Sequence, residues 1–130
     1  AEGRHVDAVS HSKARSILHN ASRRLAEFMT QYDLILSPTL GLVPPRLGVL
    51  ALDQPAEVYM REAGRASAFT ALHNMTGQPA MSVPLHWNAE GIPVGVMFAG
   101  RFGDEALLLQ LAAQLEEAQP WFDRVPQLAG

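Results

Sequence analysis

The sequence predicts an α/β fold in which helices flank a mixed sheet, with the elements in the order α-β-α-β-β-α. Apolar residues at three- and four-residue steps predict three helices, at about 12–30, at 56–75 and from 103–104 onward. Short apolar runs predict three strands, at 33–37, 80–85 and 93–99. The chain of 130 residues is long enough for one modest domain and shows no internal boundary. We therefore treat 1–130 as a single segment.

The first predicted helix has one apolar stripe, and Ser10 or Ser12 is the expected cap at its start. The stripe comprises Ala14, Ile17, Leu18, Ala21, Leu25, Phe28 and Met29. The strand at 33–37 is apolar on both faces, which predicts a strand buried inside a sheet that helices cover. The prolines and glycines that follow it predict a long irregular connection.

The second predicted helix, 56–75, has Asp53 as its expected cap and ends at Gly77, which suits a left-handed position. The segment 88–91 reads as a turn that would join strands 80–85 and 93–99 into an antiparallel pair. Gly95 inside the second of these strands predicts the close approach of another backbone.

The last predicted helix begins at Asp104, whose carboxylate would occupy the free amides of the first turn. This occupation disfavours anion binding by the glycine-bracketed loop 100–104. Pro120 ends the helix, and we expect Trp121 and Phe122 to pack their rings over the sheet.

Composition excludes several classes of protein. The chain has no cysteine, so thiolate metal sites and cysteine nucleophiles are excluded. Its formal net charge of -3 does not fit a nucleic-acid-binding surface. No apolar run has the roughly 20 residues that a membrane span needs. We expect a cytoplasmic protein with neither nucleic acid nor membrane as a partner.

Self-sufficient catalytic motifs are absent from the sequence. The spacing of His5, His11 and His19 does not suit a helical metal site. A triad of Ser82, His73 and Asp104 is disfavoured, because Ser82 falls inside a predicted strand and not on a sharp turn. His73 lies near the end of an apolar helix face, where a packing histidine with satisfied hydrogen bonds is expected more often than a base.

Several separated motifs resemble the C-terminal portion of the amidase signature family. The family run F-T-x-x-x-N-x-T-G-x-P-A-x-S-x-P is matched by Phe69, Thr70, Asn74, Thr76, Gly77, Pro79, Ala80, Ser82 and Pro84. The segments 32–39, 91–96 and 105–116 are similar to the family's Y-D-x-L-L-T-P-T, G-L-P-V-G-V/L and E-x-x-L-L-x-x-A-x-x-L-E patterns. The details of 85–88, 101–105 and 119–124 look most like bacterial members named 6-aminohexanoate cyclic-dimer hydrolases.

This resemblance implies a larger amidase domain, of which the chain is the C-terminal segment. The family hydrolyses amide bonds without a cofactor: a serine forms an acyl-enzyme, and a second serine in a cis peptide links it to a basic lysine. The glycine- and serine-rich segment that carries these groups is not found here, so no catalytic role passes to any residue of this chain. We expect the catalytic residues upstream and predict that the 130-residue chain alone is inactive.

The resemblance implies that the chain forms one side of a pocket for a small amide substrate. The second helix and the turn after it approach that pocket in the family, which makes Ser67, Thr70 and Asn74 candidate substrate-binding residues. Capping and helix packing are the alternative roles of these three. The alternative function is a binding or scaffolding module without catalysis. We also expect self-association or a rearranged sheet, because a segment removed from its domain would expose strand edges and apolar helix faces.

Overall fold

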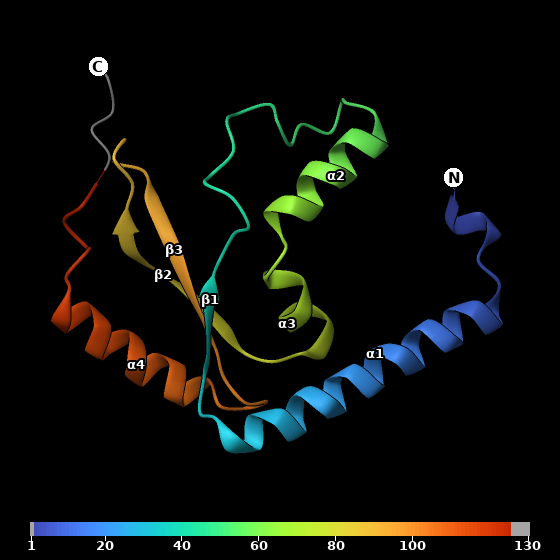
Figure 1. Ribbon diagram of the computed structural model, residues 1–130, viewed down its shortest axis with the longest axis horizontal. Helices are drawn as coiled ribbons and strands as arrows, with labels where there is room; N and C mark the ends of the chain where they lie inside the picture. Colours follow the sequence, from blue (N-terminus) through green and yellow to red (C-terminus); the bar gives the residue numbers. More distant parts are fainter. Residues whose placement is uncertain (1, 126–130) are drawn as a thin grey trace.

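The computed structural model of the chain describes residues 2–125 and confirms the α/β fold class (Figure 1). Its 3-10 helices (η), α-helices and strands are η1 (Glu2–His5), α1 (Ala8–Phe28), η2 (Met29–Gln31), β1 (Ile35–Pro38), α2 (Ala56–Ala66), α3 (Thr70–Thr76), β2 (Ala80–Trp87), β3 (Pro93–Ala99) and α4 (Glu105–Ala118). The second predicted helix is divided into two, and the order of the elements is otherwise as predicted. Within the described residues, no helix has the length and apolar character of a membrane span.

The strands form an antiparallel sheet in the order β1-β3-β2, which confirms the predicted pairing of the last two strands. Phe98 of β3 lies opposite Leu36 of β1 and Met81 of β2. The next position, Met97, lies opposite Ser82. Successive side chains of a strand point to opposite faces. Phe98 therefore belongs to one face of the sheet, and Met97 and Ser82 belong to the other.

Helix α4 covers the face that carries Phe98 (Figure 1). The core there centres on Val83, Phe98 and Leu108, all of which are buried. The partly buried residues around them are Leu34, Met81, Leu85, Val96, Leu111, Leu115 and Trp121. Trp121 thus packs as predicted, whereas the prediction for Phe122 is wrong, since its side chain is 83% exposed.

A β-bulge interrupts the pairing of β2 with β3. Val83 lies opposite Val96 and His86 opposite Val94, so β2 contains one more residue than β3 over this stretch. Proline has no N–H to donate to a ladder, and Pro84 lies inside the bulge. The Leu85 carbonyl is instead satisfied by the side-chain amide of Gln119, at 2.8 Å. The end of α4 is thereby joined to the irregular part of β2.

Helix α1 begins earlier than predicted and leaves its apolar stripe largely uncovered. The predicted cap at Ser10 or Ser12 is wrong: the Asp7 carboxylate is the cap and accepts a hydrogen bond from the Ser10 amide at 2.8 Å. No residue of the helix is buried, and Ile17 is 67% exposed. Met29, just after the helix, is the fully buried member of the predicted stripe.

The second predicted helix is broken at Ser67. The Ser67 hydroxyl and amide both donate to the Ala63 carbonyl, and the Thr70 hydroxyl donates to the Ser67 carbonyl. Such side-chain bonds compete with the regular helical ladder, which explains why one continuous helix was the wrong prediction. The expected cap at Asp53 is also wrong, because Pro55 precedes α2 without any side-chain cap. Gly77 follows α3 with φ of 77°, as predicted.

Three further predictions can be compared with the structure. The prediction that the first strand is buried on both faces is wrong. This strand, β1, pairs only with β3 in the described part of the sheet. Its residues alternate in burial, and Leu36 is 66% exposed. Asp104 precedes α4, but its carboxylate makes no capping hydrogen bond, contrary to expectation. The turn at 88–91 is confirmed: Asn88 Oδ1 accepts from the amides of Glu90 and Ile92.

Candidate functional site

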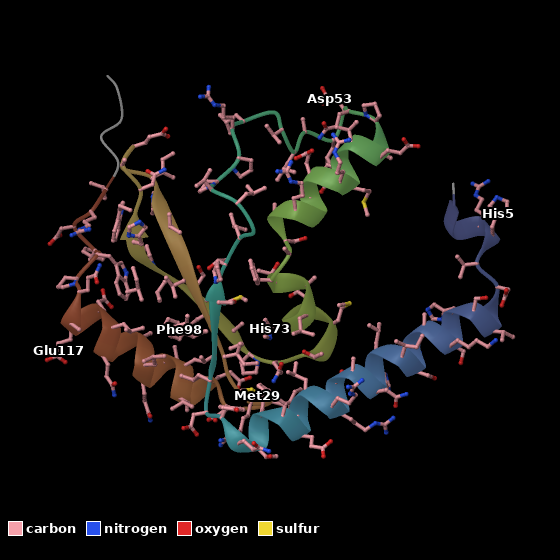
Figure 2. All side chains as sticks on the ribbon, viewed as in Figure 1. His5, Met29, Asp53, His73, Phe98 and Glu117 are labelled. Atoms are coloured by element: carbon pink, nitrogen blue, oxygen red, sulfur yellow. The ribbon has the colours of Figure 1, made fainter. Side chains whose placement is uncertain are left out.

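A cleft of about 310 Å³ lies between α3 and the sheet face turned away from α4. Figure 2 shows His73 on α3 on the opposite side of the strands from α4. The lining residues are Thr39, Thr70, His73, Asn74, Gln78, Ala80, Met81, Ser82 and Met97. None of them is Asp, Glu, Lys or Arg. The cleft therefore offers hydroxyl, amide and imidazole groups, together with apolar side chains, to a ligand. Such a lining suits an uncharged ligand.

The wall formed by α3 follows from helical geometry. Thr70, His73 and Asn74 stand at positions i, i+3 and i+4, which share one face of a helix. The left-handed Gly77 ends the helix and starts the chain toward β2, where Ser82 lies. The two segments of the cleft are therefore joined by a short turn, and their polar groups converge from opposite sides.

The sheet side of the cleft is fixed by a pair of hydroxyl groups. Thr39 Oγ1 and Ser82 Oγ lie 2.6 Å apart and share a hydrogen bond. The Thr39 amide donates to the Gly95 carbonyl at 3.0 Å. A methyl group at Gly95 would lie 2.5 Å from Ser82 Oγ and 2.6 Å from Thr39 Oγ1. The predicted close approach at Gly95 thus exists: the Thr39 backbone is hydrogen-bonded to the Gly95 carbonyl, and two side-chain hydroxyls occupy the space that a methyl group would take.

His73 is the buried polar residue of the cleft. Its side chain is 6% exposed, as expected of a packing histidine. Its Nδ1 atom, however, has no hydrogen-bond partner within residues 2–125, so the prediction of satisfied hydrogen bonds is wrong for this atom. Burying a polar atom without a partner costs about 1–3 kcal/mol. Such atoms are uncommon in folded proteins and call for a partner or a function.

Two of the three predicted site residues line the cleft. Thr70 and Asn74 do so, whereas Ser67 does not, and the Ser67 hydroxyl donates to the Ala63 carbonyl at 2.7 Å. Their roles toward a substrate stay predictions. Sequence reasoning missed His73 as a lining residue, although its spacing from Thr70 was visible. It also missed Thr39, because only the pairing of β1 with β3 brings that residue to the cleft.

The structure gives no support to a triad of Ser82, His73 and Asp104. Ser82 and His73 both line the cleft, but Asp104 is not among the lining residues and precedes α4. The Ser82 hydroxyl pairs with Thr39, and Ser82 lies within β2 as predicted. The described residues contain no group of three or more His, Asp or Glu side chains arranged to hold a metal ion.

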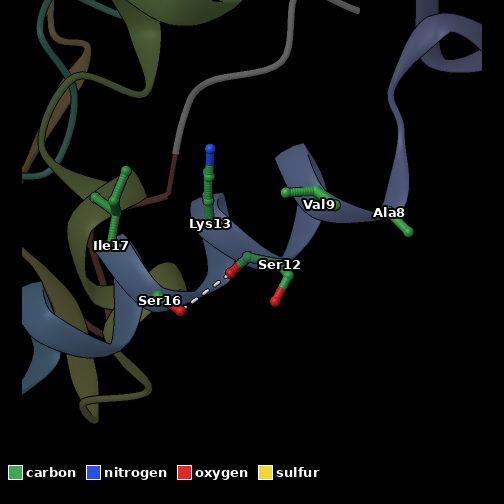
Figure 3. Close-up of a pocket in the computed structure, with 6 residues that line it drawn as sticks. All are labelled: Ala8, Val9, Ser12, Lys13, Ser16 and Ile17. Carbon is green, nitrogen blue, oxygen red and sulfur yellow. Dashed lines mark hydrogen bonds between the residues drawn. The ribbon is translucent and has the colours of Figure 1, made fainter.

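A larger hollow lies along the exposed side of α1 (Figure 3). Its lining residues all belong to this one helix and are Ala8, Val9, Ser12, Lys13, Ser16 and Ile17. The Ser16 hydroxyl donates to the Ser12 carbonyl, so it is already used within the helix. No second element supplies a converging polar group, and the hollow therefore lacks the arrangement expected of a binding site.

Solved structures of amide-processing enzymes contain this fold. The chain superposes on 6-aminohexanoate cyclic dimer hydrolase with a TM-score of 0.86 and 32% identity, covering 95% of this chain and 27% of that one. It also superposes on one chain of the glutamyl-tRNA(Gln) amidotransferase of Thermotoga maritima, with a TM-score of 0.70, 28% identity and coverage of 89% and 24%. The α/β arrangement therefore matches part of the amidase fold.

Sequence relatives agree with the structural match. A putative amidase AmiC of Mycobacterium leprae is 45% identical over 120 residues, which cover 91% of this chain and 25% of the relative. A 6-aminohexanoate-cyclic-dimer hydrolase of Paenarthrobacter ureafaciens is 41% identical over 103 residues, which cover 75% and 21%. The profile of the family described as Amidase matches residues 2–109. The chain belongs to the amidase family, and it spans about a quarter of the length of the relatives it matches.

Proposed function

We propose that this chain is the substrate-side segment of an amidase that hydrolyses carbon–nitrogen amide bonds. The observation that carries the proposal is the cleft between α3 and the sheet. It combines neutral hydrogen-bonding groups with two positions, Thr70 and Asn74, that the family resemblance singles out. A small amide suits this lining, because an amide is itself neutral and both donates and accepts hydrogen bonds. The chain supplies one side of the pocket and the scaffold that holds it.

The catalytic groups of this proposal lie upstream, outside the 130 residues. There, a serine, a second serine in a cis peptide and a lysine would form and hydrolyse the acyl-enzyme. Two features of this chain support the proposal that the catalytic groups lie upstream and not in the 130 residues. Its one lysine, Lys13, lines the hollow on α1 and not the cleft. The Ser82 hydroxyl, which does reach the cleft, is paired with a hydroxyl and not with a base.

The test compares two proteins: the 130-residue chain, and a longer chain that contains it together with an upstream amidase region. Ammonia or amine release from a panel of small amides is measured for both. The longer chain is expected to turn over amides, and the 130-residue chain is not. Turnover by the short chain that disappears in Ser82→Ala would refute the proposed division. Binding of amides by the longer chain without turnover would favour a binding module.

We also propose that the 130-residue chain associates with itself. Large apolar side chains are exposed on the three helices α1, α2 and α4. They include Val9, Ile17 and Phe28 on or at the end of α1, Met60 on α2 and Leu109 on α4, each of which is at least 50% exposed. Strands β1 and β2 are also the two edges of the described sheet. Exposed large apolar side chains and open strand edges can promote association.

Light scattering over a range of concentrations tests this association. The expected result is a mass that rises above 14.1 kDa as the chain concentration increases. Replacing Ile17 with a charged residue, Ile17→Glu, is expected to weaken the association. The matched control is Ser16→Glu, which adds the same charge one position away. A single species at the monomer mass throughout the range would contradict the proposal.

A further inference from the structure

We propose that the hydroxyl pair of Thr39 and Ser82 binds the substrate by donating a hydrogen bond to a second carbonyl oxygen, one that does not react. The inference rests on the proposed function and adds a substrate class to it: amides that have another neutral carbonyl group in the same molecule. Its basis is a pair of hydroxyls that line the cleft, lie 2.6 Å apart and are bonded to each other.

The hydroxyls lie on the face of the sheet that is turned toward the cleft. Ser82 of β2 is opposite Met97, whereas the next residue of β3, Phe98, belongs to the face that α4 covers. Successive side chains of a strand point to opposite faces, so Ser82 points away from α4. Ser82 is exposed, and so is its hydrogen bond to Thr39. A ligand in the cleft can therefore reach the pair.

The backbone around Gly95 holds the pair in place. The Thr39 amide donates to the Gly95 carbonyl, and the two hydroxyl oxygens fill the space that a side chain at Gly95 would take. Groups that are held in position before binding lose little freedom when a ligand binds. The pair therefore suits one directed hydrogen bond to a ligand.

The pair has one hydroxyl hydrogen more than its mutual bond uses. Each hydroxyl has a single hydrogen, and either oxygen can be the donor of the shared bond. Whichever oxygen accepts that bond keeps its own hydrogen for another acceptor. Within residues 2–125, neither hydroxyl makes a further hydrogen bond. The accepting hydroxyl is also the stronger donor, because hydrogen bonds in a chain polarise one another.

The carbonyl that the pair binds is distinct from the reacting one. A reacting carbonyl oxygen is held by hydrogen-bond donors beside the nucleophile. The proposed function puts the nucleophile upstream of this chain, so the hydroxyl pair is left for a different acceptor of the same substrate. A substrate with a second carbonyl group has such an acceptor.

The surroundings of the pair define the rest of the ligand. Asp, Glu, Lys and Arg are absent from the described lining, so a charged group would be desolvated there without a compensating charge. Ala80 and Met97 line the cleft on the same sheet face as Ser82 and offer apolar surface. A second carboxamide on a short aliphatic chain fits this combination. We therefore infer that aliphatic diamides are preferred over monoamides of equal chain length.

Substitutions in the longer, catalytically complete chain test the contact. Thr39→Val and Ser82→Ala each remove one hydroxyl, and the double variant removes both. Thr39→Ser keeps the hydroxyl and removes the methyl group. The matched control is Ser37→Ala, because the Ser37 hydroxyl is also on β1 but donates to the Pro38 carbonyl, and Ser37 does not line the cleft.

KM, kcat and the melting temperature are measured with succinamide, glutaramide and adipamide, each compared with the monoamide of the same chain length. The double variant should raise KM for the best diamide about threefold to tenfold, the usual effect of one lost hydrogen bond. KM for the monoamide and kcat for both should change little. Thr39→Ser and Ser37→Ala should resemble the parent.

Two outcomes would overturn the proposal. One is an equal rise in KM for diamide and monoamide, since the pair would then not recognise a second carbonyl. The other is a lower melting temperature of the double variant with an unchanged preference for the diamide. The free hydroxyl hydrogen would in that case bond the upstream part of the protein and not the substrate.

A binding measurement separates this proposal from the proposed function. In the longer chain labelled with ¹³C-methyl threonine, the Thr39 methyl resonance is identified by its absence in Thr39→Ser and followed as glutaramide is added. A saturable shift that needs more glutaramide in Ser82→Ala supports the contact. Such a shift without turnover would refute the amidase proposal and leave the contact standing. Turnover of glutaramide without any response of the Thr39 methyl group would overturn the contact and leave the amidase proposal standing.

Discussion

Thr39 and Ser82 share a hydrogen bond of 2.6 Å, although 43 residues separate them in the sequence. The bond joins the end of β1 to β2 directly above the central strand β3, which lies between them. The arrangement requires that the residue beneath the two hydroxyls has no side chain, and Gly95 meets that requirement. The polar side of the cleft therefore depends on a glycine that contributes no group of its own.

Gly95→Ala is expected to destabilise the chain by about 1–3 kcal/mol, a typical cost of forcing extra atoms into a packed site. The new methyl group would meet both hydroxyl oxygens at once. Thermal unfolding at a fixed chain concentration measures the effect, because association makes the midpoint depend on concentration. The matched control is Gly64→Ala, in α2, where the new methyl group would meet no atom within 4 Å apart from the neighbouring backbone of its own helix.

The control has a predicted direction of its own. Alanine is favoured over glycine inside a helix by about 0.5–1 kcal/mol, so Gly64→Ala should be neutral or stabilising. Equal effects of the two substitutions would show that Gly95 does not have the crowded surroundings described here.

Arg101 is expected to matter more for stability than its ion pair indicates. Its guanidinium donates to the Met29 carbonyl at 2.9 Å, to the Tyr32 carbonyl at 3.1 Å and to Asp33 Oδ1 at 2.9 Å. It therefore holds the end of α1 and the segment before β1 against the loop that follows β3. Arg101→Ala should cost about 1.5–3 kcal/mol, since several charge-assisted bonds are lost.

A comparison with Asp33→Ala isolates the two backbone contacts of Arg101. Asp33 is 81% exposed, and ion pairs in such positions contribute about 0–1 kcal/mol. Arg101→Lys should behave like a partial loss, because an ammonium group cannot reproduce the fork of the guanidinium. Denaturant unfolding of the three variants should rank them in the order Asp33→Ala, Arg101→Lys, Arg101→Ala, from mild to severe.

Local pattern predicted the elements that short-range chemistry fixes. The antiparallel pair, the turn closed by Asn88 and the left-handed Gly77 all follow from residues within a few positions of one another. The break at Ser67 was missed, because it depends on side-chain hydrogen bonds to the backbone. These are the bonds from the Ser67 hydroxyl to the Ala63 carbonyl and from the Thr70 hydroxyl to the Ser67 carbonyl. Thr39 was missed as a site residue for another reason. Strand register, which no local pattern reveals, brings it beside Ser82.

The exposed apolar stripe of α1 illustrates a different limit of sequence reasoning. Periodicity correctly predicted that Ile17 and Leu18 share a helix face, but it cannot tell what covers that face. In the described chain it is left largely open, and Ile17 is 67% exposed. The same periodicity placed Met29 on the stripe, and this residue is buried. The same apolar pattern therefore contains a core residue, Met29, and an exposed residue, Ile17.

The start of α1 should depend on pH through Asp7. The Ser10 backbone amide, which donates to the carboxylate, lowers the pKa of Asp7 below its ordinary value of 3.8. A carboxyl whose pKa is lower in the folded state stabilises that state above the unfolded pKa, and the contribution is lost as the pH falls through the folded pKa. The first turn of α1 should therefore loosen only below about pH 4.

Amide hydrogen exchange at Ser10 measures this loosening as the pH is lowered, after correction for the intrinsic pH dependence of exchange. Asp7→Asn should keep the cap and remove the pH dependence, since asparagine also accepts a bond from the helix start. Asp7→Ala should loosen the turn at every pH. Protection at Ser10 that is equal in the parent and in Asp7→Ala would contradict the capping role.

The predicted site residues should separate into two kinds when each is changed to alanine in the longer, catalytically complete chain. Asn74→Ala removes an amide that lines the cleft and should raise KM severalfold, the effect expected when a polar contact to the ligand is lost. Ser67→Ala removes a hydroxyl that donates to the Ala63 carbonyl, so it should lower the melting temperature slightly and leave KM unchanged. Steady-state kinetics and thermal unfolding on the same preparations decide between these outcomes. A KM effect of Ser67→Ala equal to that of Asn74→Ala would mean that Ser67 reaches the substrate, as the family resemblance first implied, and that the pocket extends past the break between α2 and α3.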